Sequence, residues 1–189
     1  MVDNPDISQI EHQIAYCREE GCDFVVLSLH WGLEHELYPH PEQLDWARRF
    51  AECGADLIVG HHPHIIQPIE IYRPARDPHK PVPIMYSLGK LTPIMSNSAT
   101  ILSLVAQLKL AKGEINGKTV VMPTGLSLTP TVILQHEAGD HAPLGIYRLD
   151  RLLAGKIAAL DQQMISYLEK LAYYADLILG ADWRSRNER

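Results

Sequence analysis

The chain has 189 residues, which is enough for one domain with a core of its own. It carries 17 Lys and Arg against 23 Asp and Glu, a formal net charge of −6 without a basic block, so nucleic acid is not expected as a partner. Three cysteines without a C-x-x-C pair argue against a disulfide framework. No apolar run is long enough to span a membrane and no signal peptide is recognisable, so a cytoplasmic location is favoured.

The first part of the chain alternates helical and strand patterns. A proline-started pattern with apolar residues at helical spacing predicts a helix over 5–20, and an apolar run predicts a strand over 23–29. Pro41 opens a second helix that Gly54 ends, and a further apolar run predicts a strand over 55–60. Strand, helix and strand with short connections form a right-handed βαβ unit. The sequence therefore predicts an α/β fold with a parallel sheet.

The later part of the chain is rich in β-branched residues. Mixed or antiparallel strands are predicted over 65–72, 82–87, 100–110, 119–122 and 131–135. An Asn-Gly pair within 112–118 predicts a tight hairpin. Apolar residues at three- and four-residue steps predict one long helix over 151–179, followed by a polar, frayed tail from Trp183. The expected organisation is a domain over 1–150 and a C-terminal amphipathic helix with its tail over 151–189.

Histidines follow both predicted parallel strands. His30 ends the first, and His61, His62 and His64 follow the second. Ligand sites in open parallel sheets lie outside the carboxyl ends of the strands, so we expect these side chains to converge. Proline restricts the residue before it to extended conformations, so His62 should be extended ahead of Pro63. Residues two apart in an extended chain share a side, which predicts that His62 and His64 face one point and that His61 faces away.

Three imidazoles at one point suit a divalent metal. We expect His30, His62 and His64 to bind manganese, zinc or iron, as one or two ions. Glu34 lies four residues after His30. We expect it to act as an oxygen ligand of the metal, as a hydrogen-bond partner of one of the ligands, or as a general base. His30 and Glu34 are therefore the candidate catalytic residues.

Four motifs resemble one known family. They are SLHWGLE from Ser28, GADLIVGHHPH from Gly54, QPIE from Gln67 and YSLG from Tyr86. Together they resemble the CapA family of bacterial capsule and poly-γ-glutamate synthesis proteins, whose domain is similar to calcineurin-like metallophosphatases. The resemblance covers roughly residues 20–135. It implies a partial metallophosphatase-like sandwich, in which a βαβ unit precedes mixed strands and a long C-terminal helix.

The resemblance also implies roles for individual residues. It makes His30, His62 and His64 metal ligands of a phosphoesterase-like hydrolytic site. The upstream Gly-Asp and Asn-containing motifs of such proteins do not occur in this chain, so we expect the C-terminal portion of the domain, with an incomplete site holding a single ion. Lys90 stands where the family usually has asparagine, and a lysine beside a metal would oppose cation binding. The substrate implied is anionic or polymer-related, and the partners are subunits of a synthesis complex.

Two other interpretations stay open. In the first, the chain is a non-catalytic binding or assembly module of a polymer-synthesis complex that uses the helix over 151–178 to contact a partner. In the second, the chain is a partial product whose missing first half would complete the sheet. An exposed strand edge and aggregation would then be expected.

Overall fold

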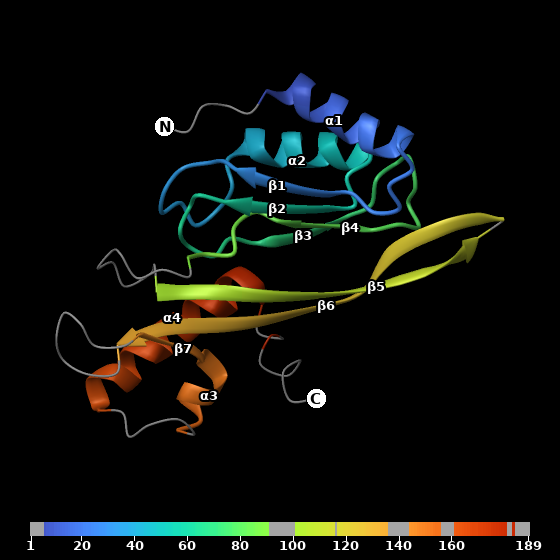
Figure 1. Cartoon of the computed structure of the whole chain (residues 1–189). Helices are drawn as coiled ribbons and strands as arrows, with labels where there is room; N and C mark the ends of the chain where they lie inside the picture. Colours follow the sequence, from blue (N-terminus) through green and yellow to red (C-terminus); the bar gives the residue numbers. More distant parts are fainter. Residues whose placement is uncertain are drawn as a thin grey trace.

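The computed structural model describes residues 6–90, 101–115, 117–135, 144–155, 161–180 and 183. Within these ranges the chain forms a four-stranded and a three-stranded sheet. Figure 1 shows that the sheets stack on each other, with helices covering the outer face of each. The mixed α/β class predicted from the sequence is therefore confirmed, and the likeness to a metallophosphatase sandwich stays an inference from the motifs.

The first sheet is built on the predicted βαβ unit. Its elements are α1 (Ile7–Glu19), β1 (Val26–His30), α2 (Pro41–Cys53), β2 (Leu57–His61), β3 (Ile69–Tyr72) and β4 (Val82–Met85). The strand order is β1-β2-β4-β3, with β1, β2 and β4 parallel and β3 antiparallel to β4. Of the predicted strand over 65–72 only the last four residues form β3. The carboxyl ends of β1 and β2 therefore lie side by side.

Helix α2 connects the two strands and covers the sheet. Pro41 stands at its first position, and Gly54, with a φ of 127°, ends it. The buried face of α2 packs with α1 and the sheet in one core, which includes Ile14, Leu29, Trp31, Ala47, Phe50, Ala51, Ile58, Ile84 and Tyr86. The apolar residues that recur at helical spacing on α2 thus pack against the parallel strands.

The second sheet is antiparallel. It consists of β5 (Leu102–Ile115), β6 (Lys118–Gln135) and β7 (Leu144–Arg148), in the order β5-β6-β7. The predicted hairpin is confirmed, because Ile115 pairs with Lys118 and Gly117 has a φ of 73°. Asn116 lies outside the described residues. The two strands predicted over 119–122 and 131–135 are parts of the single strand β6, and β7 was not predicted.

The prediction of one long helix over 151–179 is wrong. The structure has two helices here, α3 (Leu149–Leu153) and α4 (Gln162–Leu179). Gly155, with a φ of 66°, follows the end of α3, and the Asp161 carboxylate accepts from the backbone N–H of Met164 at 2.7 Å as the N-cap of α4. A local stop and a local start signal therefore outweigh the continuous apolar spacing.

The apolar face of α4 packs on its own sheet. Leu168, Leu171 and Ala175 are buried in a second core together with residues of β5, β6 and α3. Trp183 belongs to this core, and its indole N–H donates to Asp176 at 2.8 Å, so the predicted frayed tail does not begin there. Among the described helices none is both long and apolar enough to cross a membrane.

Candidate metal centre

The three histidines predicted as ligands come together at the carboxyl ends of β1 and β2. His30 and His61, the last residues of these strands, are register partners. The ring centroids of His30 and His62 lie 4.7 Å apart, and those of His62 and His64 lie 5.7 Å apart. The structure thus places His30, His62 and His64 in one row of imidazoles.

A carboxylate joins this row. Oε1 of Glu34 lies 3.6 Å from Nε2 of His64, and one ligand atom each of Glu34, His62 and His64 lies within 4.8 Å of the other two. His30 is outside this group of three and contacts it through the ring of His62. Two imidazoles and one carboxylate form the ligand set of several catalytic zinc sites, in which a fourth position stays open. The donor atoms therefore fit a divalent metal.

The site faces solvent. The Glu34 side chain is 48% exposed and the His64 side chain 28% exposed. His35 extends the row of imidazoles on the same side, since its ring centroid lies 6.3 Å from that of His64. Sequence reasoning did not include His35, because no strand end or local motif distinguishes it from a surface histidine.

The backbone of the site has an unusual conformation. In the part of the chain that the structure describes, the non-glycine residues with a positive φ are His35 (64°), His62 (102°) and His64 (62°). The expectation that His62 is extended is therefore wrong. The chain turns sharply after β2, and His62 and His64 meet through this turn and not through strand alternation. Each such conformation costs about 1–3 kcal/mol and persists only where the surrounding structure imposes it.

Burial within the cluster affects the protonation of His62. Loss of solvent lowers the pKa of the His62 imidazole below its ordinary value of 6.5, and the neighbouring His30 and His64 lower it further, while Glu34 acts in the opposite direction. The neutral imidazole, which is the form that binds a metal, is thereby favoured.

A buried pair of aromatic side chains, Trp31 and Tyr86, lies next to His30. Trp31 is 1% exposed, stacks on Tyr86 with ring centroids 5.9 Å apart, and donates its indole N–H to the Tyr86 carbonyl at 3.1 Å. A Cβ on Gly60 would collide with that carbonyl and with the Trp31 ring nitrogen. Glycine at position 60 therefore allows Trp31 to pack across the strand ends, next to His30.

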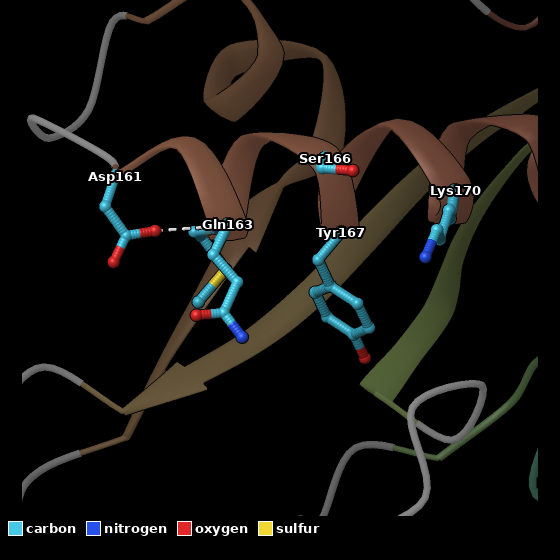
Figure 2. A pocket seen from close by; sticks show the side chains of 6 residues that line it. Asp161, Gln163, Ser166, Tyr167 and Lys170 are labelled. Atoms are coloured by element: carbon cyan, nitrogen blue, oxygen red, sulfur yellow. Dashed lines mark hydrogen bonds between the residues drawn. The ribbon is translucent and has the colours of Figure 1, made fainter.

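A hollow of about 440 Å³ lies along the start of α4, away from the histidine row. Its lining is Asp161, Gln163, Met164, Ser166, Tyr167 and Lys170. Figure 2 shows that Gln163, Tyr167 and Lys170 extend from the same side of this one helix. Among the described lining residues there is one carboxylate and one ammonium group and no histidine or cysteine, so this part of the lining lacks the grouped ligands of the histidine row.

Known proteins resemble the half of the chain that contains the histidine row. Residues 2–92 match the family model described as bacterial capsule synthesis protein PGA_cap. The PGA biosynthesis protein CapA of Bacillus subtilis is 42% identical over 71 residues, which are 38% of this chain and 17% of that protein. Over residues 2–92 the chain is therefore similar to the CapA family.

Further relatives support this similarity. The capsule biosynthesis protein CapA of Bacillus anthracis is 38% identical over 87 residues, or 46% of this chain and 20% of that protein. A probable polyglutamine synthesis accessory protein of Mycobacterium tuberculosis is 34% identical over 67 residues, or 35% of this chain and 16% of that protein. The matched part of the chain thus corresponds to a fifth or less of each relative's length.

The CapA match corrects the extent of the resemblance. The match begins at residue 2 and ends at residue 92, whereas the motifs suggested roughly 20–135. All members of the histidine row, and Glu34, lie inside it, together with α1, α2 and the whole first sheet. The second sheet and the C-terminal helices lie outside the matched residues.

Proposed function

We propose that this CapA-family chain takes part in bacterial capsule or poly-γ-glutamate synthesis and binds a divalent metal ion for hydrolytic chemistry. The ion is zinc, manganese or iron, held by Glu34, His62 and His64 with His30 beside them. One observation carries the proposal: ligand atoms of the first three residues lie within 4.8 Å of one another. The names of the relatives support the synthesis role.

The backbone supports a binding role for the same residues. Positive φ values coincide with His35, His62 and His64, which are adjacent in space although two segments of the chain contribute them. Strained conformations of this kind cluster at functional sites, because there they position a side chain at a cost in stability. A surface cluster of solvated histidines would not require them.

The chain's own residues divide the chemistry between them. His62 and His64 offer imidazole nitrogens, and Glu34 contributes a carboxylate oxygen. A divalent ion bound there supplies Lewis-acid polarisation of a substrate oxygen. His30 is exposed and lies next to His62. From there it could accept a proton from a bound substrate or donate one to it. The substrate that fits is anionic, such as a phosphoester or a glutamyl polymer, because its charge complements the cation.

Metal binding is the direct test. We expect calorimetric titration of the purified chain with ZnCl₂ or MnCl₂ to show one site, and the double variant His62→Ala/His64→Ala to show none. His12→Ala is the matched control, since it removes a histidine on α1 and should leave binding unchanged. Equal metal uptake by the native chain and the double variant would reject the proposal. Hydrolysis of a nitrophenyl phosphodiester, dependent on the added metal, then tests the chemistry.

A non-catalytic assembly role is the second candidate function. The observation that favours it is the outer part of the β5–β6 ribbon, which extends beyond the first sheet (Figure 1) and exposes Leu110 and Ile115 by 48% and 50%. The helix earlier considered as the contact surface uses its apolar face internally. Light scattering over a concentration series should detect self-association if the ribbon binds a second copy. Loss of that association in Leu110→Lys would identify the surface.

A further inference from the structure

Two hydrogen bonds join the loop that carries Glu34 to the segment after β2. The backbone N–H of His35 donates to the Pro63 carbonyl at 2.9 Å, and the side-chain amide of Gln67 donates to the Glu36 carbonyl at 2.8 Å. The loop residues themselves are largely exposed, and the side chain of Glu34 is 48% exposed. These two bonds, together with Leu37, which packs against the second core, therefore hold Glu34 near His64.

Gln67 is a firm attachment point. Its side chain is 1% exposed, and its backbone N–H donates to the Ser87 carbonyl at 3.0 Å, just beyond β4. The preceding residues Ile65 and Ile66 are each 3% exposed, and Ile66 forms a β-bridge with Leu88. Gln67 is thus held by the body of the fold on one side while it holds the exposed loop on the other.

Folding alone does not explain a glutamine at this position. The Oε1 atom of Gln67 is buried and has no hydrogen-bond partner among the described residues. A buried polar atom without a partner lowers stability, and an apolar side chain of similar shape would avoid that loss. The other bond partner, Glu36, is in an exposed stretch where water can satisfy its carbonyl. What the glutamine adds is the donor that fixes the loop.

We propose that Gln67 is a positioning residue of the metal site, which holds Glu34 in reach of His64 through the Glu36 carbonyl. The inference rests on the proposed metal binding at Glu34, His62 and His64. Residues that orient metal ligands without touching the metal typically change its affinity by about 10–100-fold when replaced. Loss of the Gln67 donor should therefore weaken metal binding and leave the fold intact.

The experiment is a double-variant cycle on the full chain. The zinc dissociation constant is measured by calorimetry for the native chain, Gln67→Met, Glu34→Gln and the combination. We expect Gln67→Met to raise the zinc dissociation constant of the native chain by about 10–100-fold. In the Glu34→Gln background the same substitution should leave the dissociation constant unchanged. A merely structural role would weaken binding equally in both backgrounds. Thr131→Val is the matched control, since Thr131 also has a buried oxygen without a partner in the described structure but lies in the second sheet.

Each outcome decides between the two proposals. If the native chain binds no zinc, the proposed metal site fails. Two results would overturn the role of Gln67 and leave the metal site standing. In the first, the native chain binds zinc and Gln67→Met leaves the dissociation constant unchanged. In the second, Gln67→Met weakens zinc binding to the same degree in the native chain and in the Glu34→Gln variant. Should Gln67→Met lose its cooperative unfolding transition, Gln67→Leu repeats the test, because leucine also fills a buried position and has no donor for the Glu36 carbonyl.

Discussion

The two ends of the parallel strands in the first sheet have opposite designs. At the amino end of β2, Asp56 is fully buried and forms ion pairs with Arg18, Lys80 and Arg76. At the carboxyl ends, the histidine row is open to solvent, and His62 has a strained backbone. Charges at one end satisfy one another, whereas at the other end ligand atoms of Glu34, His62 and His64 lie within 4.8 Å of one another. The first end therefore contributes to stability, and the second is the end at which we propose metal binding.

The cluster around Asp56 is integrated with the end of α2. The Asp56 carboxylate accepts from the Val25 backbone N–H at 2.8 Å and lies 2.8 Å from Nζ of Lys80. Arg18 also donates to the Gly54 carbonyl at 2.7 Å, and Arg76 donates to the Ala51 carbonyl at 2.7 Å. Cations at a helix C-terminus oppose its partial negative charge. One buried carboxylate thus organises a lysine and two arginines, and the two arginines also cap the helix.

The largest effect is expected at Asp56. Asp56→Asn leaves the buried Lys80 ammonium and two partly exposed guanidinium groups without their anion. Breaking a buried ion pair costs about 3–5 kcal/mol in the free energy of unfolding. Urea denaturation followed by circular dichroism measures it. Asp23→Asn is the control, because Asp23 also precedes a strand and pairs with Lys112 at 2.6 Å, but both side chains are about half exposed or more. That variant should lose less than about 1 kcal/mol. Similar losses in the two variants would contradict the contrast.

A smaller effect of opposite sign is expected at His62. Glycine adopts a φ of 102° without the steric cost that a Cβ brings, so His62→Gly should raise the free energy of unfolding in EDTA by about 1 kcal/mol. His30→Gly, within β1, should lower it, because glycine weakens a strand. Urea denaturation of both variants provides the comparison. Destabilisation by His62→Gly would show that its side chain contributes to folding and that the strain argument fails.

The smallest effect is expected on the pH dependence of stability. The folded chain holds the pKa of His62 below 6.5, so the unfolded chain binds more protons once the pH falls through that value. The stabilisation from neutral His62 is complete above this pH and is lost as the pH falls toward the lowered pKa. We expect the native chain, free of metal, to lose more stability between about pH 7 and pH 5 than His62→Gln does. Parallel pH profiles of the two proteins would refute this prediction.

Local patterns were sufficient for the framework of the fold. Apolar runs and helix signals predicted β1, α2 and β2, and an Asn-Gly pair predicted the β5–β6 turn. These features depend on residues close in sequence, which is why they could be recognised without coordinates. The same reasoning was wrong for the helix over 151–179, where Gly155 and Asp161 end one helix and start another. The apolar spacing there reports burial against the second sheet and not helix continuity.

The sequence by itself determined that histidines stand at the carboxyl ends of neighbouring parallel strands, because strand ends and motifs are local properties. Only the tertiary structure decided that Glu34 joins His62 and His64, and that His62 turns with a positive φ. These details depend on attachments between distant segments, such as the bond from Gln67 to Glu36 across 31 positions. Loop geometry is set by such long-range hydrogen bonds, and they override the conformational preferences of the loop residues themselves.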